Sequence, residues 1–148
     1  MSPSARAILG TLLVPSGCFV DTSVVSVPCR TLIVDDDADM AFLAGEMIRL
    51  ANDGLLLAGI AYSGDEAMEK LAEADVVVLD FRMPGRNGLE LASDILAVRP
   101  GQKIVLFSAY LDNATLDEAE RLGICECVSK DAVSDLPDVV RRHCTTAA

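Results

Sequence analysis

Carboxylates end two apolar runs of this sequence. Three consecutive acids, 35–37, directly follow the apolar run 31–34, and Asp80 directly follows the run 76–79. Two carboxylates about 4 Å apart repel each other by roughly 4 kcal/mol at an effective dielectric constant near 20. Such a cluster is therefore favourable mainly when a cation lies among its members. We expect these acids to share one cation-binding pocket.

Within this pocket, Asp36 and Asp80 would supply hard oxygen ligands, and Asp35 could hold the ion through water. Oxygen ligands of this kind suit Mg²⁺ better than softer metals. Two further polar side chains, Ser108 and Lys130, follow other apolar runs. The lysine can pair with a carboxylate or a phosphoryl oxygen, and the hydroxyl can donate to an oxyanion. These groups are what phosphoryl transfer onto a carboxylate requires, with Asp80 as the nucleophile.

The elements that must position these residues alternate between strand and helix from residue 29 onward. The sequence pattern predicts strands at 31–34, 55–61, 76–79, 104–107 and 124–128, and helices at 38–51, 64–72, 88–98, 113–122 and 132–144. Three of the strands are almost purely apolar, which is typical of parallel strands covered on both faces. Five strand–helix units in series indicate an α/β doubly wound parallel sheet with helices on both faces. Ligands of such sheets bind beyond the carboxyl ends of the strands, where the polar residues lie.

The first predicted helix carries four apolar residues at helical spacing. Met40, Leu43, Met47 and Leu50 recur every three or four positions, so we expect them to pack in the core.

The overall composition limits the classes of function. The 148 residues suffice for one domain, and 51% of them are hydrophobic, which supports a buried core. Acidic residues outnumber basic residues 23 to 12, for a net charge of −11, so we expect no direct binding of nucleic acid. No apolar stretch reaches the ~20 residues that a membrane span needs. We therefore expect a cytoplasmic protein without a membrane segment.

The cysteines and the N-terminus give weaker signals. The five cysteines are Cys18, Cys29, Cys125, Cys127 and Cys144. Their spacing fits no zinc or redox pattern, so we expect free thiols in a reducing cytoplasm. Residues 1–28 show no helical stripe and are interpreted as a poorly ordered N-terminal extension that precedes a domain at 29–148. A signal sequence is the alternative for this segment, but proline and glycine interrupt its apolar run.

From about residue 29 to residue 144, the chain resembles a response-regulator receiver domain of bacterial two-component signalling. The resemblance rests on the residues at 34–37, 79–88, 107–109 and 128–132. It implies a flavodoxin-like sheet of strand order 2-1-3-4-5. It also implies that a histidine kinase phosphorylates Asp80, and that Asp35, Asp36 and the main-chain carbonyl of Arg82 join Asp80 around Mg²⁺.

The same resemblance makes Ser108 the switch hydroxyl and Lys130 the phosphate-contacting lysine. One position departs from the family pattern, because Cys127 stands where Tyr or Phe is usual. Ala109 and Tyr110, which follow the switch hydroxyl, are with Cys127 the candidate modulators of the switch. An Asp-Ala pair follows the lysine, as in the subfamily that usually carries a helix-turn-helix output domain.

Only one helix fits after Lys130, so we expect a stand-alone receiver or a receiver cut from a longer regulator. Its phosphorylation would switch a surface that binds a downstream protein or output domain, and the fourth helix, fifth strand and fifth helix could mediate a homodimer. The chain would be no enzyme beyond catalysing its own phosphorylation and dephosphorylation. One alternative is a Mg²⁺-dependent phosphohydrolase with Asp35 or Asp80 as nucleophile, although the chain lacks an Asp-x-Asp-x-Thr signature. The other is a pseudo-receiver that binds partners without phosphorylation.

Overall fold

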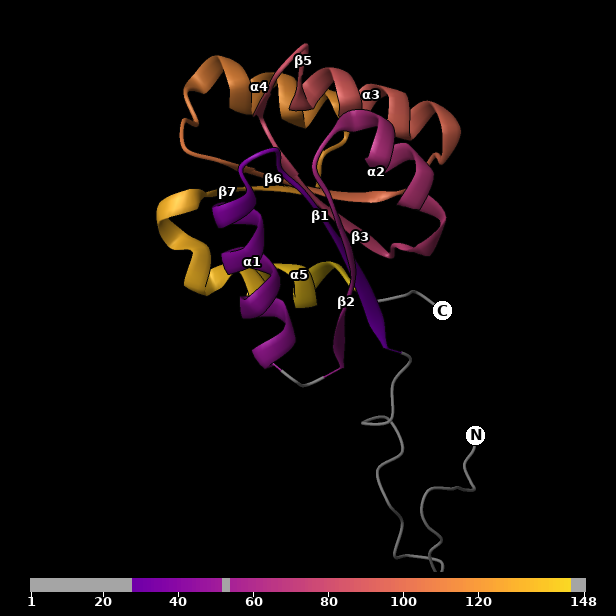
Figure 1. The fold of residues 1–148 in the computed structure, drawn as a ribbon. Coiled ribbons are helices and arrows are strands. Elements are labelled where there is room, and N and C mark those ends of the chain that lie inside the picture. The colour runs from indigo at the N-terminus through magenta and orange to yellow at the C-terminus, as the bar shows by residue number, and fades with distance from the viewer. Residues whose placement is uncertain (1–27, 52–53, 145–148) are drawn as a thin grey trace, which may run out of the picture.

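A five-stranded parallel sheet forms the centre of the fold (Figure 1). The computed structural model describes residues 28–51 and 54–144, so the expected N-terminal extension and Cys18 lie outside the described residues. The strands of this sheet are β1 (Cys29–Val34), β2 (Leu55–Ala61), β3 (Val76–Asp80), β6 (Lys103–Ser108) and β7 (Glu126–Ser129). They lie in the order β2-β1-β3-β6-β7, which confirms the predicted doubly wound topology.

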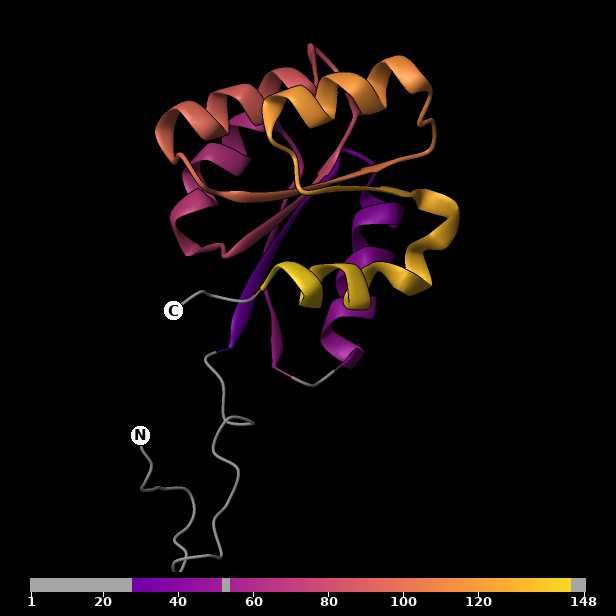
Figure 2. The same ribbon diagram turned by 180° about the vertical axis from the view of Figure 1, so that it is seen from behind.

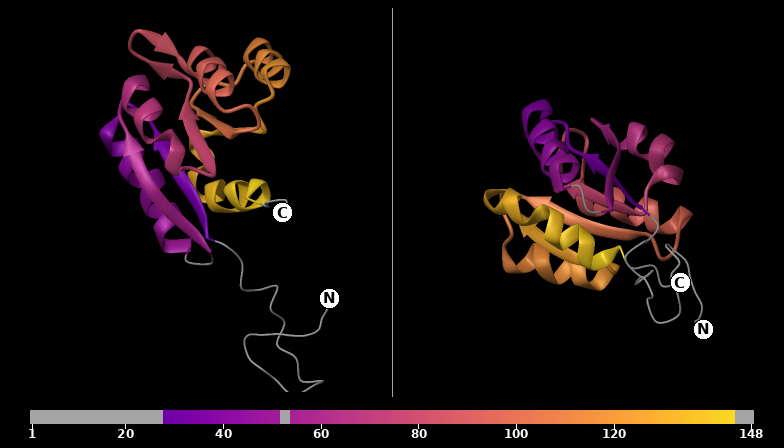
Figure 3. Two further views of the ribbon diagram at one scale, coloured as in Figure 1. Left: turned by 90° about the vertical axis from the view of Figure 1, so that its right-hand side faces the viewer. Right: turned by 90° about the horizontal axis from the view of Figure 1, so that it is seen from below.

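Helices cover both faces of the sheet (Figures 1 and 3). They are α1 (Ala38–Ala51), α2 (Gly64–Lys70), α3 (Gly88–Val98), α4 (Asn113–Leu122) and α5 (Leu136–His143). α1 and α5 lie on one face, whereas α2, α3 and α4 lie on the other, with α3 and α4 side by side in Figure 2. Short 3₁₀ segments follow α2 at Leu71–Glu73 and precede α5 at Lys130–Asp135. None of the described helices is long and apolar enough to cross a membrane.

The predicted last helix starts later than expected. Residues Lys130–Asp135 form the 3₁₀ segment, in which Ala132 has non-helical backbone angles, and α5 begins only at Leu136. Pro137 lies in the first turn of α5, where its fixed φ and its missing N–H are tolerated.

Two apolar clusters hold the layers together. The central strand β3 is buried along its whole length, and its alternate side chains enter the two clusters. One cluster packs Ile33 and Phe107 of the sheet against α1 and α5. The other packs Leu32 and Leu79 of the sheet against α2, α3 and α4.

The predicted core face of α1 was partly wrong: Met40 packs against the buried cluster, but Leu43 and Leu50 face outward. Leu43 and Leu50 are 41% and 72% exposed, and the buried residues are Ala41, Ala44, Gly45 and Ile48. The helix turns its small residues inward because it lies close to β2: a Cβ added to Gly45 would lie 3.1 Å from Leu57 Cδ2. A larger residue at Gly45 would have to displace the Leu57 side chain, so the close approach favours a small residue there.

The prediction that the cysteines are free thiols was wrong for one pair. Cys29 and Cys144 form a disulfide with a Cα–Cα distance of 5.8 Å, which joins the start of β1 to the residue after α5. Cys125 and Cys127 are free thiols, as expected. The sequence did not indicate the pair because 115 positions separate its members. Only the parallel sheet and the return of α5 along it bring the two residues together.

A small hairpin that the sequence analysis did not predict lies between β3 and α3. Its strands are β4 (Arg82–Met83) and β5 (Arg86–Asn87), joined by a turn in which Gly85 has φ +88°. After the hairpin, Gly88 N–H donates to Phe81 C=O at 2.6 Å and α3 begins with a capping box. The backbone that follows Asp80 is therefore held tightly against the start of α3.

Gly88→Ala should destabilise the protein strongly. The added Cβ would lie 2.3 Å from the main-chain oxygen of Asp80, so the backbone beside this acid must shift. We expect the free energy of unfolding, measured by urea denaturation, to fall by about 3 kcal/mol. Gly59→Ala is the matched control, because its Cβ would meet only ordinary contacts at 3.8 Å and beyond. Equal stability of the two variants would contradict this packing.

Candidate functional site

The carboxyl ends of four strands bring the predicted polar residues to one edge of the sheet. Asp35 follows β1, Asp80 ends β3, Ser108 ends β6 and Lys130 follows β7. Lys130 Nζ lies 2.9 Å from Asp35 Oδ2 and 3.1 Å from Asp80 Oδ1. The lysine therefore joins the two acids that the sequence places 45 positions apart.

Asp36 completes an acidic cluster with these two residues. One carboxylate oxygen from each of Asp35, Asp36 and Asp80 lies within 4.8 Å of the others. Asp35 and Asp80 are 1% and 5% exposed, whereas Asp36 is open to solvent. The single lysine neutralises only part of this charge. A hard divalent cation fits such a set of oxygen donors, and the open side would let the ion keep water ligands.

The environment of Asp80 disfavours its ionised form. Burial and the nearby Asp35 charge raise the pKa of Asp80 to about 6, although Lys130 and the Arg82 backbone N–H act in the opposite direction. Burial alone would lower the pKa of Lys130, but the two neighbouring carboxylates outweigh it and raise that pKa. The ammonium therefore stays charged at neutral pH, and a further cation would relieve the remaining repulsion between the acids.

Ser108 is buried and is hydrogen-bonded to its own loop. Its Oγ donates to Tyr110 C=O at 2.9 Å and accepts from Tyr110 N–H at 3.1 Å. Tyr110 is 64% exposed, and the Arg82 guanidinium lies 4.9 Å from the centre of its ring. This stacking connects the loop after β3 with the loop after β6. The family resemblance implies a role only for the carbonyl of Arg82, and no sequence signal marks this side-chain contact.

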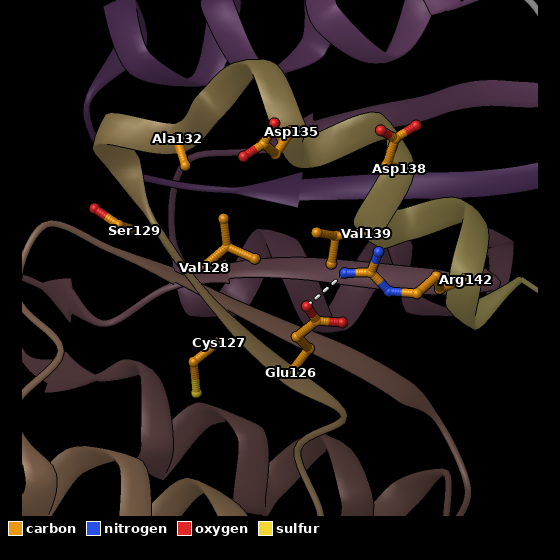
Figure 4. A pocket seen from close by; sticks show the side chains of 9 residues that line it. All are labelled: Glu126, Cys127, Val128, Ser129, Ala132, Asp135, Asp138, Val139 and Arg142. Atoms are coloured by element: carbon orange, nitrogen blue, oxygen red, sulfur yellow. Dashed lines mark hydrogen bonds and ion pairs between the residues drawn. The ribbon is translucent and has the colours of Figure 1, made fainter.

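The other two candidate modulators are Ala109 and Cys127. Ala109 is exposed beside Ser108, and Cys127 is half-buried in β7. Cys127 points away from α5 (Figure 4) and packs against the cluster formed with α2, α3 and α4. Burial raises the pKa of its thiol, so it is a weak nucleophile at neutral pH. Cys127 thus contributes a small apolar group to the packing of the edge strand.

Asp37 has a structural role that the sequence analysis did not assign. Its Oδ1 accepts from the backbone N–H groups of Asp39 and Met40 at 3.0 and 3.3 Å, so it caps the start of α1. Its own N–H donates to Asp35 Oδ1 at 2.9 Å. The third acid of the run therefore fixes the turn that presents the other two.

A groove of about 460 Å³ lies between β7 and α5 (Figure 4). Val128 and Val139 contribute apolar surface, and an ion pair of 2.7 Å between Glu126 and Arg142 crosses one end. Asp135 and Asp138 lie on the side formed by α5 and the segment before it. The groove adjoins Lys130 through the 3₁₀ segment, which connects it to the acidic cluster along the chain.

The comparisons with known proteins agree with this geometry. The sequence model of the response regulator receiver domain matches residues 31–141. The chemotaxis protein CheY of Thermotoga maritima is 37% identical over 103 residues, which are 68% of this chain and 84% of CheY. The transcriptional regulatory protein PdtaR of Mycobacterium tuberculosis is 33% identical over 114 residues, which are 75% of this chain but only 54% of PdtaR. The chain belongs to the response regulator receiver domain family.

Solved structures support the same fold. The response regulator domain of Thermotoga maritima CheB superposes with a TM-score of 0.71 and 24% identity, and the match covers 82% of this chain and 99% of that domain. A CheY-like receiver domain protein from Methanospirillum hungatei gives a TM-score of 0.64 and 19% identity, with coverage of 80% and 97%. At these identities the structures establish the fold, and function must be argued from the site.

Proposed function

We propose that this protein is a Mg²⁺-dependent phosphoacceptor that a histidine kinase phosphorylates on Asp80. The observation that carries the proposal is the ion-paired cluster in which Lys130 lies within 3.1 Å of both Asp35 and Asp80 beside the exposed Asp36. Family membership adds to it, since receiver domains act in phosphorelay signalling.

In the proposed reaction, a carboxylate oxygen of Asp80 attacks the phosphorus of a phosphohistidine. A P–O bond forms, the P–N bond breaks, and the imidazole leaves with the electron pair. Asp35, Asp36, Asp80 and the Arg82 carbonyl would hold Mg²⁺, which when bound supplies positive charge to the transferring oxygens. Lys130 is already charged and close enough to pair with a phosphoryl oxygen once Asp80 is modified. Hydrolysis of the acyl phosphate would restore Asp80.

The switch would begin at Ser108. Phosphorylation adds about −1.5 to −2 charges, and a hydroxyl that turns to donate to the new oxygens must give up its bond to Tyr110 C=O. Breaking that bond frees the loop after β6, along with the ring that stacks on Arg82. If Lys130 moves toward the phosphoryl group, it would also shift the 3₁₀ segment that borders the groove between β7 and α5. This face, with α4, is the proposed surface for a downstream protein, an output domain or a second copy.

The remaining expectations form part of the same proposal. The protein would act in the cytoplasm and bind neither membrane nor nucleic acid directly. Its catalysis would be limited to its own phosphorylation and dephosphorylation. The phosphohydrolase and the pseudo-receiver remain the alternatives. A phosphohydrolase would turn over phosphate esters, and a pseudo-receiver would bind its partners without being phosphorylated.

Incubation with Mg²⁺ and a small acyl phosphate tests the proposal. We expect the intact mass of the wild-type protein to rise by one phosphoryl group, and Asp80→Asn to show no increase. Addition of a chelator should abolish the gain. An unchanged wild-type mass would favour the pseudo-receiver, and catalytic turnover of unrelated phosphate esters would favour the phosphohydrolase.

Asp80→Asn should also stabilise the metal-free protein at neutral pH. Because folding raises the pKa of Asp80 from 3.8 to about 6, its contribution to stability is present below pH 4 and is lost as the pH rises through 6. The neutral amide avoids this loss. We expect the free energy of unfolding of the variant to exceed that of the wild type by about 1–3 kcal/mol at pH 7.5. The difference should shrink at pH 4.5.

Urea denaturation in the presence of a chelator at both pH values measures this difference. Mg²⁺ should remove most of it at pH 7.5, because the ion binds and stabilises the wild-type cluster more than the variant. A stability difference that does not depend on pH would contradict the conclusion that ionisation of Asp80 is unfavourable in the folded protein.

A further inference from the structure

The disulfide lies at the opposite end of the sheet from the acidic cluster. Cys29 is the first residue of β1, and Asp35 follows the last residue of this strand. A rise of about 3.3 Å per residue therefore places Cys29 and Asp35 roughly 20 Å apart. In Figures 1 and 2, the end of α5 returns to the start of β1. The bond therefore fastens the end of α5 without touching the phosphoacceptor site.

The two bonded cysteines differ in how far each residue is buried. Cys29 is 6% exposed and belongs to the buried cluster beneath α1 and α5, whereas Cys144 is only partly buried. We therefore expect an incoming thiolate to attack the sulfur of Cys144, with Cys29 as the leaving group. Exchange rates depend on access to the attacked sulfur as well as on thiol acidity.

Disulfides are rare in reducing compartments, and those that occur there are usually transient and redox-sensing. We propose that Cys29 and Cys144 form a thiol–disulfide exchange site, which dithiol reductants open and low-molecular-weight disulfides close, and which controls how firmly the end of α5 is held. The inference rests on the proposed cytoplasmic function, because in an oxidising compartment the same bond would be permanent.

The exchange balances with these two partners. In reduction, a thiolate of the dithiol attacks Cys144 Sγ, the S–S bond breaks, and Cys29 leaves as a thiolate that takes up a proton. The second thiol of the reductant then attacks the mixed disulfide and releases Cys144, so that the dithiol is oxidised as the protein gains two hydrogens. Oxidation by a small disulfide follows the reverse path and releases two small thiols.

Without the bond, the last turn of α5 is held by side-chain contacts rather than by a covalent link. Val139 and Val140 are buried and keep the middle of the helix on the sheet. Beyond them, Arg142 and His143 contact Glu126 at 2.7 and 2.9 Å. The Arg142 side chain is largely exposed, and such a pair contributes little stability, whereas the His143 contact is partly buried. Because Arg142 lines the groove between β7 and α5, reduction would loosen one end of that groove.

The proposal is tested on the full chain, prepared under oxidising conditions and then treated with a dithiol in native buffer. Peptide mapping after alkylation should find the Cys29–Cys144 bond before treatment and both thiols alkylated afterwards. We expect reduction to lower the melting temperature by about 10 °C. It should also speed amide hydrogen exchange at residues 139–143 by at least tenfold. Oxidised glutathione should restore the original values.

Variants separate this site from the other cysteines. Cys29→Ser should form a mixed disulfide with glutathione at Cys144, and its melting temperature should match that of the reduced wild type. Cys125→Ser is the control and should keep the full response to reductant. Phosphorylation by a small acyl phosphate should be retained in both redox states, so its failure would count against the proposed function and not against the exchange site.

Three results would overturn the proposal. The first is a bond that resists the dithiol until the protein unfolds. The second is a reduced protein with unchanged melting temperature and unchanged exchange at residues 139–143. The third is a mapped bond that pairs Cys29 or Cys144 with a different cysteine.

Discussion

Asp36→Asn should slow phosphorylation of Asp80 by about 100-fold. Asp36 is the exposed member of the acidic cluster, and its oxygen lies within 4.8 Å of those of Asp35 and Asp80. Replacing it with an amide removes one charge that would attract Mg²⁺, while the two ion pairs of Lys130 remain. A bound cation contributes several kcal/mol to charge stabilisation in phosphoryl transfer, and each 1.4 kcal/mol lost costs about tenfold in rate.

The neighbouring acid offers a matched control. Asp37 caps α1 through the N–H groups of Asp39 and Met40. Asp37→Asn has the same change of charge one residue away, but asparagine is also a good N-cap. We expect it to keep the phosphorylation rate within a few fold of the wild type.

Rates would be measured from intact masses over time at fixed acyl phosphate and varied Mg²⁺. Equal rates for the two variants would show that net charge, rather than a ligand position, controls the reaction.

Lys130→Met should allow phosphorylation of Asp80 but weaken the structural change that follows it. The methionine keeps the apolar stem of the lysine but leaves the buried carboxylates of Asp35 and Asp80 without their cation. Removing one partner of a buried ion pair typically costs 3–5 kcal/mol. We expect the free energy of unfolding of the metal-free variant to fall by about 3 kcal/mol, and millimolar Mg²⁺ to restore much of this loss.

The same variant should still accept a phosphoryl group, because Asp80 and the proposed metal ligands remain. Its response should be blunted, since nothing then draws the 3₁₀ segment Lys130–Asp135 toward the phosphate. Amide hydrogen exchange before and after phosphorylation measures this response. A change in residues 130–143 equal to that of the wild type would contradict the role assigned to Lys130. Lys103→Met, at the exposed start of β6, is the control and should behave as the wild type.

Local signals in the sequence were strong enough to predict much of the fold. The predicted helices 38–51, 88–98 and 113–122 agree with α1, α3 and α4, and strand 55–61 agrees with β2. The structure shows capping residues at two of these helices: Asn87 caps the start of α3, and Gly123 ends α4 in a left-handed conformation. Such signals act over a few residues and can therefore be read without the tertiary structure.

The grouping of the acids could also be predicted, because parallel strands place their carboxyl ends at one edge. This rule predicts that Asp80 lies close to Asp35 and Lys130, as it does in the structure. The chemical roles of these residues stay predictions, which the proposed experiments test.

The errors come from contacts between distant elements. The apolar residues of α1 fit two different helical stripes. The stripe that is buried contains small residues such as Gly45, and only the closeness of β2 explains why. The disulfide depends on the return of α5 to β1. The internal hydrogen bond of Ser108 depends on the conformation of the loop that contains Tyr110. None of these contacts follows from spacing along the chain.

Chemical labelling can identify which residue carries the phosphoryl group. Borohydride reduces an aspartyl phosphate to homoserine, so treatment of the phosphorylated protein followed by peptide sequencing marks the acceptor. We expect homoserine at position 80 alone, and only when Mg²⁺ was present during phosphorylation. Homoserine at position 35 or 36, or at no position in a protein that has gained a phosphoryl group, would contradict this expectation.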